Sequence, residues 1–174
     1  AFRGGVNLAI VDLDVDGFDD IVTGAGLTGG PHVRVFLPDG QLITDTFVFD
    51  SSDRAGVSIA TLDPNGDGRH EVMASHFGMS SPEARLVAFT DNGSVLHDPF
   101  PTYGASYRYG TSVFPVDDSR VAFAHNGHGG PHVRVFDASG VPIREWFAYE
   151  ANVRDRVVLS ATATDRLITA RTRP

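Results

Sequence analysis

Short apolar and β-branched runs recur along the chain, separated by segments rich in Gly, Asp and Asn. The run from Val6 to Val11 is typical: β-branched residues bounded by Gly and Asp predict a strand. Turn sequences such as Pro38-Asp39-Gly40 and Asp91-Asn92-Gly93 predict hairpins, because Gly and Asn tolerate positive φ. The strands expected in this way cover residues 6–11, 21–25, 29–36, 41–49, 57–62, 72–76, 82–89, 94–100, 111–116, 121–125, 129–136 and 141–149. The pattern therefore indicates an all-β protein.

The predicted strands repeat in groups of four. Segments starting at Gly5, Gly56 and Gly110 align with one another at steps of 51 and 54 residues, and a shortened copy starts near Arg156. We divide residues 1–174, as a single array without a domain boundary, into repeats 5–55, 56–109 and 110–155 and a partial repeat 156–174. Repeats of this length with several strands each are typical of propeller-like or solenoid arrays. Four antiparallel strands make one β-propeller blade, so we expect about three blades plus a two-stranded partial blade.

Two links between predicted strands place oxygen-bearing side chains at alternate positions. The links begin at Asp12 and Asp63, and each has such residues at positions 1, 3, 5 and 9 and Gly at position 6. Calcium takes about six to eight oxygen ligands, the glycine permits a sharp bend, and the carbonyl at position 7 can add a ligand. The candidate ligands are Asp12, Asp14, Asp16, Phe18 and Asp20 in the first loop, and Asp63, Asn65, Asp67, Arg69 and Glu71 in the second. The sequence thus predicts about two Ca²⁺ ions, the alternative being an acidic turn without an ion.

The loops differ from EF-hands. An EF-hand supplies a bidentate Glu at position 12, where these loops have Thr23 and Ala74, and the flanking segments predict strands instead of helices. In the third repeat, Asp117 lies only 4 positions before Val121, so five residues of the loop are missing and we expect no calcium there.

These loops, together with the two identical GGPHVRVF segments at 29–36 and 129–136, carry a resemblance to a known family. The chain resembles the FG-GAP/VCBS repeats of the integrin α-subunit propeller and of many secreted bacterial proteins. The resemblance covers essentially the whole chain, although the third and fourth copies lack the complete loop. It implies a calcium-binding β-propeller and a role in adhesion, scaffolding or carbohydrate binding more often than in catalysis.

The composition limits the binding partners and the cellular locations that the sequence favours. The formal net charge is −8, which two calcium ions would change to −4. An acidic chain without a basic stripe argues against nucleic-acid binding, and no apolar run is long enough to predict membrane insertion. Cysteine is absent, so calcium would replace disulfides as the stabilising element of an extracellular, secreted or cell-surface protein. Because the sequence opens at Ala1, we expect a processed product or an excised piece.

A second candidate site lies on the face opposite the calcium loops. Strand directions alternate within a blade, so the links that follow the second and fourth strands share that face. The candidate ligand-binding residues there are His76, Tyr103, Tyr107, Arg108, Tyr109, His125, His128 and Arg171. Aromatic rings and hydrogen-bonding groups suit sugars. The alternative is that the histidines only hydrogen-bond to neighbouring loops.

The chain contains no G-x-S-x-G or H-E-x-x-H motif, so we expect no catalytic residues. The favoured function is a non-catalytic, calcium-stabilised extracellular interaction or scaffold module. A lectin-like carbohydrate binder is the alternative, and a polysaccharide-active enzyme domain is the third possibility. Three and a half blades do not close a propeller, so the expected partners are a protein or carbohydrate ligand, further copies of the chain, or the remainder of a longer propeller.

Overall fold

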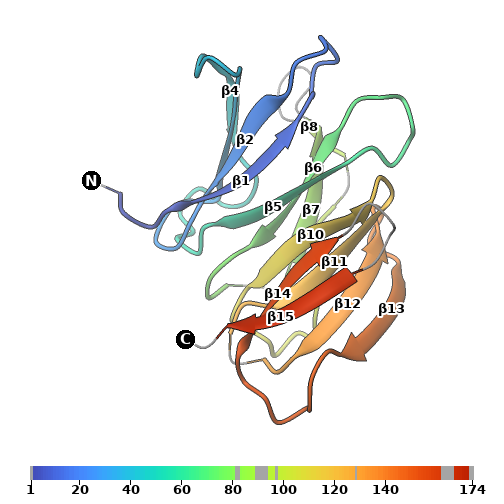
Figure 1. The fold of residues 1–174 in the computed structure, drawn as a ribbon. Coiled ribbons are helices and arrows are strands. Elements are labelled where there is room, and N and C mark those ends of the chain that lie inside the picture. The colour runs from blue at the N-terminus through green and yellow to red at the C-terminus, as the bar shows by residue number, and fades with distance from the viewer. Residues whose placement is uncertain are drawn as a thin grey trace.

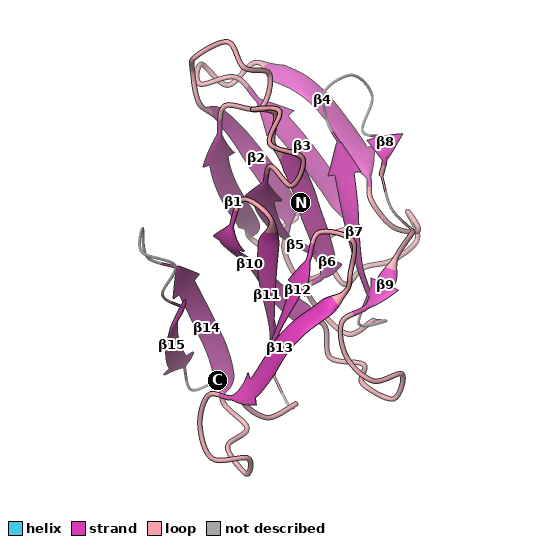
Figure 2. Ribbon diagram, turned by 90° about the vertical axis from the view of Figure 1, so that its right-hand side faces the viewer, coloured by secondary structure: helices cyan, strands magenta, loops and turns pink. Residues whose placement is uncertain are grey.

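The computed structural model describes residues 2–80, 83–88, 94–96, 98–127, 129–161 and 167–172. The described chain is all-β, with antiparallel strands and no helix (Figure 1 and Figure 2), which confirms the predicted class. It accordingly contains no helix that could cross a membrane.

The strands form four sheets, one for each predicted repeat, and neighbouring strands in the sequence pair within each sheet except for β8 and β9. The first sheet contains β1 (Val6–Val11), β2 (Asp20–Ala25), β3 (His32–Phe36) and β4 (Leu42–Phe47). The second contains β5 (Val57–Leu62), β6 (Glu71–His76), β7 (Glu83–Ala88), β8 (Ser94–Val95) and β9 (Phe100–Pro101). The third contains β10 (Thr111–Asp117), β11 (Arg120–His125), β12 (His132–Asp137) and β13 (Pro142–Phe147), and the fourth contains β14 (Arg156–Ala161) and β15 (Leu167–Thr172).

The outer strand of the second sheet differs from the prediction. In place of one strand over 94–100, the short strands β8 and β9 both pair with β7. Pro99 and Pro101 lack the N–H that a continuous strand would contribute to the ladder. Proline also explains why β3 and β12 begin at His32 and His132, three residues after the predicted starts, since Pro31 and Pro131 precede them.

The sheets pack face to face in chain order. We call the face toward the preceding repeat the backward face and the face toward the next repeat the onward face. The onward face of the first sheet (Val22, Val33) packs on the backward face of the second (Val57, Ile59, Val72) in one apolar cluster. Two further clusters join the second sheet to the third and the third to the fourth. Burial of these Val-, Leu- and Phe-rich faces is the main force that holds the repeats together.

The first strands of successive sheets lie next to one another and are joined by polar contacts. The Asn7 Nδ2 donates to the Val57 carbonyl at 2.7 Å, and the Val113 N–H donates to the Ser58 Oγ at 3.1 Å. These contacts hold neighbouring sheets in register. The described sheets thus form a series of four antiparallel units, and closure of the series into a propeller is not seen in this part of the chain.

Candidate functional site

The two predicted metal loops have the same internal hydrogen bonds. In the first, Asp12 accepts from the N–H groups of Asp16 (3.1 Å) and Gly17 (2.9 Å). In the second, Asp63 accepts from Asp67 (3.2 Å) and Gly68 (2.9 Å). The position 5 carboxylate also accepts from the position 7 N–H at 2.8 Å in both loops. Both loops are therefore wound so that the side chains at positions 1, 3 and 5 turn toward the backbone of the same bend.

The backbone adopts positive φ at two positions in each loop. Gly17 (φ 92°) and Gly68 (φ 84°) confirm the bend expected at position 6. Position 4 also has positive φ, with Gly66 at 70° in the second loop and Val15 at 64° in the first. A β-branched residue is strained in this region. The spacing of the oxygen-bearing residues does not predict this second bend, for which Gly66 is the one signal in the sequence.

In the first loop, three of the predicted ligands converge. Asp12, Asp14 and Asp20 each offer one carboxylate oxygen, and these oxygens lie within 4.8 Å of one another. Asp20 is buried at the start of β2 and accepts from the Leu13 N–H at 3.1 Å. Burial raises the pKa of Asp20, and repulsion from the other loop carboxylates adds to this effect. Asp16 is outside this group and is exposed, as is Phe18.

The second loop contains a buried carboxylate with an unsatisfied oxygen. Glu71 begins β6 and is 5% exposed, and its Oε2 has no hydrogen-bond partner. Burial raises the pKa of Glu71, and the charges of Asp67 and Asp63 raise it further. At position 3, the Asn65 Nδ2 donates to Asp67 at 3.0 Å. A buried acceptor without a donor is costly, and a cation in the loop would satisfy it.

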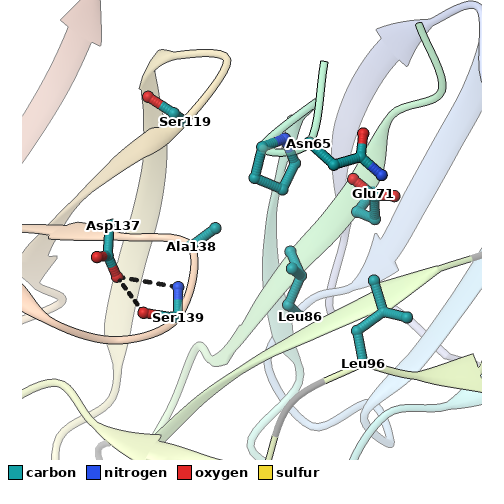
Figure 3. A pocket seen from close by; sticks show the side chains of 9 residues that line it. Asn65, Glu71, Leu86, Leu96, Ser119, Asp137, Ala138 and Ser139 are labelled. Carbon is teal, nitrogen blue, oxygen red and sulfur yellow. Dashed lines mark hydrogen bonds between the residues drawn. The ribbon is translucent and has the colours of Figure 1, made fainter. Parts of the chain in front are cut away.

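A cavity of about 500 Å³ opens beside the second loop (Figure 3). Asn65 and Glu71 face it from the second sheet, and Ser119, Asp137 and Ser139 face it from the third. Asp137 is occupied by its own turn, since it accepts from the N–H of Ser139 at 3.0 Å and from its hydroxyl at 2.7 Å. Glu71 thus borders a cavity that opens beside the second loop.

The donor set of both loops fits a hard divalent cation. Carboxylates, an amide oxygen and backbone carbonyls are the ligands of calcium in proteins, and the unsatisfied Glu71 oxygen and the converging first-loop carboxylates lack internal counter-charges. Asp12, Asp14 and Asp20 would hold the ion in the first loop, with Asp16 and the Phe18 carbonyl as further candidates. Asp63, Asn65, Asp67 and Glu71 would hold it in the second, with the Arg69 carbonyl as a further candidate. The bound ion would supply positive charge to these carboxylates.

The substitution Glu71→Gln is expected to affect stability differently with and without calcium. Without calcium, it removes a buried charge that Asp63 and Asp67 repel, so we expect the free energy of unfolding to stay the same or increase. With calcium, the loss of a charged ligand should weaken binding at the second loop about tenfold or more. Thermal melts in chelator and in calcium measure both effects.

The control for this prediction is Glu150→Gln, which changes an exposed glutamate outside the loops. If Glu71→Gln destabilised the protein equally in chelator and in calcium, Glu71 would be only a structural residue of β6.

The shortened link of the third repeat has a different structure. Asp117 and Arg120 are paired in the register of β10 and β11 and form an ion pair. The Asp117 carboxylate also accepts from the Ser119 N–H at 2.9 Å. These contacts lower the pKa of Asp117 although partial burial opposes the shift.

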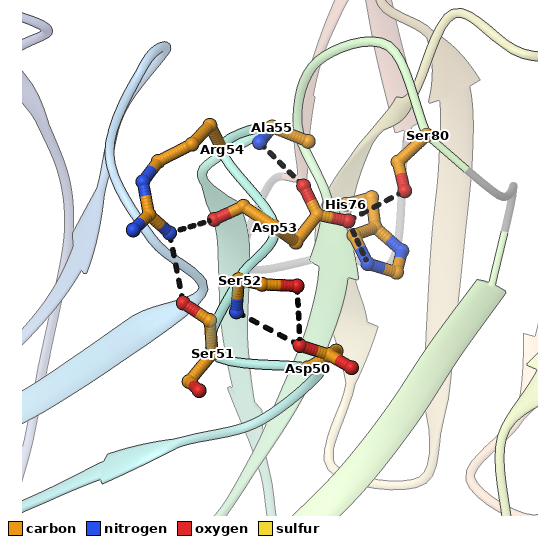
Figure 4. A network of polar contacts seen from close by, with 8 residues as sticks. All are labelled: Asp50, Ser51, Ser52, Asp53, Arg54, Ala55, His76 and Ser80. Carbon is orange, nitrogen blue, oxygen red and sulfur yellow. Dashed lines mark hydrogen bonds and ion pairs between the residues drawn. The ribbon is translucent and has the colours of Figure 1, made fainter.

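On the opposite face, His76 is buried within a polar network (Figure 4). Its ring stacks on Phe49 of the preceding repeat, with centroids 3.8 Å apart, and its Nε2 lies 3.3 Å from the Asp53 carboxylate. Asp53 also accepts from Ser80 at 2.7 Å and from the Ala55 N–H at 2.6 Å. These hydrogen bonds lower the pKa of Asp53 against the opposing effect of burial. Here His76 joins a link of the first repeat to the second sheet.

His125 occupies the equivalent position in the third sheet and is also buried. Its ring lies against Tyr103 (3.9 Å between centroids) and Tyr107 (4.2 Å, stacked). The Nδ1 lies 3.1 Å from the Gly130 carbonyl oxygen, so Nδ1 is the protonated nitrogen, and the buried Nε2 has no partner. Burial lowers the pKa of His125 to about 4. A side chain on Gly129 would meet this ring, since a Cβ there would clash with the Nδ1 of His125.

The structure brings the predicted tyrosines together but buries most of their surface. Tyr103 is buried with its hydroxyl 2.8 Å from the carbonyl oxygens of Phe123 and His132, and burial raises its pKa well above the ordinary value. The Tyr107 hydroxyl donates to the Gly110 carbonyl at 2.9 Å. Tyr109 packs edge-on against Tyr107 and is exposed, as is Arg108. Arg171 belongs to β15, where it pairs with Val157, and His128 lies outside the described residues.

The link after each outer strand carries an arginine whose role the sequence analysis did not identify. Arg54, Arg108 and Arg154 each donate from Nη1 to the carbonyls one and three residues earlier. The three arginines occupy the same place relative to Gly56, Gly110 and Arg156, and this spacing was the available signal. Arg108 therefore has a structural role in its own link, whatever it contacts outside the chain.

Compared with known proteins, the sequence matches no family model and has no significant match among curated proteins. The resemblance to FG-GAP/VCBS repeats therefore rests on the residues of the loops and of the GGPHVRVF segments alone.

Proposed function

We propose that the chain is a non-catalytic, calcium-stabilised interaction module of the FG-GAP/VCBS type, made of propeller blades and acting outside the cell. The observation that carries this proposal is the convergence of Asp12, Asp14 and Asp20 within 4.8 Å, in a loop whose hydrogen bonds recur in the second repeat. The unsatisfied oxygen of buried Glu71 supports a second site.

Calcium would act on the fold through the strand connections. Each loop joins the first two strands of a sheet, so an ion in it fixes the connection between β1 and β2 or between β5 and β6. Extracellular calcium modules bind their ion with Kd of about 10⁻⁴–10⁻³ M. Such sites are occupied where calcium is abundant, which supports an extracellular location for a chain without cysteine.

The placement of the titratable groups supports the non-catalytic part of this proposal. The clustered carboxylates belong to the loops, and His76 and His125 are buried against aromatic rings of the links. An enzyme of this fold would need an acid or base within reach of its substrate. Carbohydrate binding remains the alternative function, with exposed Tyr109 and Arg108 as its contact residues. A glycan array, repeated with Tyr109→Ala, separates this alternative from binding to a protein.

Calorimetric titration of the calcium-free protein tests the proposal. We expect binding at about two sites per chain and a higher melting temperature in calcium, because a ligand that binds only the folded state stabilises it. Titration with magnesium gives the selectivity, since Mg²⁺ requires a stricter octahedral geometry. Absence of heat and of thermal protection at millimolar calcium would overturn the proposal.

A further inference from the structure

The first sheet exposes residues whose equivalents are buried in every other sheet. The first strands align as Val6, Val57, Thr111 and Val157 at one position and as Leu8, Ile59, Val113 and Leu159 two residues later. Val6 is 59% exposed and Leu8 is 61% exposed. The three equivalents of Val6 are 0% exposed, and those of Leu8 are between 3% and 7% exposed. The backward face of the first sheet therefore has the apolar residues of a sheet interface without a sheet covering them.

This exposed face continues beyond β1. Ile10, Phe2 and Phe47 are between 50% and 66% exposed. A cavity of about 600 Å³ runs over the face, lined by Val6 and Phe36 among apolar residues and by Arg34 and His32 among polar ones. Contiguous apolar surface of this kind marks an interaction site.

The interfaces inside the chain show which surface covers a backward face. Between the second and third sheets, the first strand of the preceding onward face supplies the small residue Ser58, whose Oγ accepts from the Val113 N–H. In the same interface, the preceding link supplies a carbonyl acceptor, since Arg134 donates to the Thr102 carbonyl at 2.6 Å. Arg34 is the equivalent of Arg134 in the first sheet, and it is exposed. The surface complementary to the exposed backward face is therefore the onward face of another sheet of the same repeat type.

We propose that a second copy of this chain covers the face with its two-stranded fourth sheet. In the fourth sheet, Ser160 and Ala170 are exposed on the onward face. Val158 is at the strand position that Asn7, Ser58 and Ser112 occupy in the other sheets. The register of the internal interfaces places Val158 of one copy against Val6 of the next, where an apolar side chain suits the apolar face.

The contact joins different surfaces of the two copies, so it is head-to-tail. Such interfaces produce rings when the rotation closes and filaments when it does not. Isolated molecules have no other free onward face among the described sheets, since those of the first three sheets are covered within the chain. The inference stands apart from the proposed function, because it depends on apolar contacts between sheets and not on the calcium ligands.

Sedimentation velocity over a range of protein concentrations, at saturating calcium, tests the interface. We expect reversible self-association that Leu8→Arg weakens about tenfold or more, since it puts a charge into the apolar centre of the contact. Ile143→Arg on β13 is the matched control, because Ile143 is also exposed (51%) but lies outside the face. A chain that stays monomeric at every concentration, or association that Leu8→Arg leaves unchanged, would overturn the inference.

Disulfide trapping tests the head-to-tail arrangement. The chain has no native cysteine, so chains with Val6→Cys and chains with Val158→Cys can be mixed and oxidised. We expect cross-linked pairs that contain one chain of each kind and few pairs of identical chains. Pairs of Val6→Cys chains alone would indicate a symmetric face-to-face contact and contradict the proposal. If Val158→Cys misfolds, Ser160→Cys takes its place. Calorimetric titration of each variant with calcium shows whether calcium binding is retained, independently of the cross-linking result.

Discussion

Asp14→Asn is expected to lower the melting temperature in calcium by roughly 5–10 °C. The substitution is isosteric and keeps an acceptor for the Asp16 N–H, which now lies 3.2 Å from the Asp14 carboxylate. It removes one of the three carboxylates that converge in the first loop. An ion present at about 100 times its Kd stabilises the folded state by about 2.7 kcal/mol, and each kcal/mol shifts the melting temperature of a chain of this size by about 2–4 °C.

Differential scanning calorimetry, with and without chelator, makes the measurement. The matched control is Asp39→Asn, because Asp39 also accepts a backbone N–H, that of Gln41 at 2.9 Å, but lies outside the calcium loops. In chelator, Asp14→Asn and the native chain should melt at similar temperatures, since both have an empty loop. A similar loss of stability in chelator and in calcium would show that Asp14 acts through its turn and not through an ion.

The second large effect is a loss of stability in acid that depends on His125. Burial lowers the pKa of this residue from 6.5 to about 4 in the folded chain. Between these two values the unfolded chain binds a proton that the folded chain does not, so folding becomes less favourable as the pH falls. The full difference corresponds to about 3 kcal/mol, present above pH 6.5 and lost by about pH 4.

His125→Gln provides the comparison, because glutamine does not titrate. The free energies of unfolding of the two proteins, measured in chelator by urea denaturation, should converge by about 3 kcal/mol between pH 7 and pH 4. Asp20 and Glu71 have raised pKa values and act in the opposite direction, but both chains contain them, so their effect cancels in the comparison. A constant difference across this range would mean that His125 titrates normally in the folded state.

The sequence was sufficient for the strand order and for the convergence of Asp12, Asp14 and Asp20 in the first loop. Strand ends are set by local chemistry, such as the Gly and Asp residues around β1, and side chains at alternate positions of one short loop turn toward the backbone of the same bend. The break between β8 and β9 was also local, since Pro99 and Pro101 were visible in the sequence. Closure of the sheets into a propeller stays a prediction.

The burial of the histidines on the face opposite the calcium loops could not be predicted from local sequence patterns. His76 and His125 end their strands at positions that are open in an isolated sheet. They are covered because Phe49 and Tyr103 come from the link of the preceding repeat, and such long-range contacts leave no local pattern. The left-handed conformation of Val15 could not be predicted for a different reason, since a β-branched residue disfavours that conformation.

The placement of these aromatic residues has a consequence for how such arrays can be divided. The link after each outer strand belongs in sequence to one repeat, but Phe49, Tyr103 and Tyr149 make their contacts with the sheet that follows. A recombination breakpoint at Gly56 or Gly110 would thus separate the sheet that follows from the aromatic side chain that packs on it. The module that can be exchanged or duplicated as one piece begins earlier, ahead of the aromatic residue, and is offset from the repeat that the sequence displays.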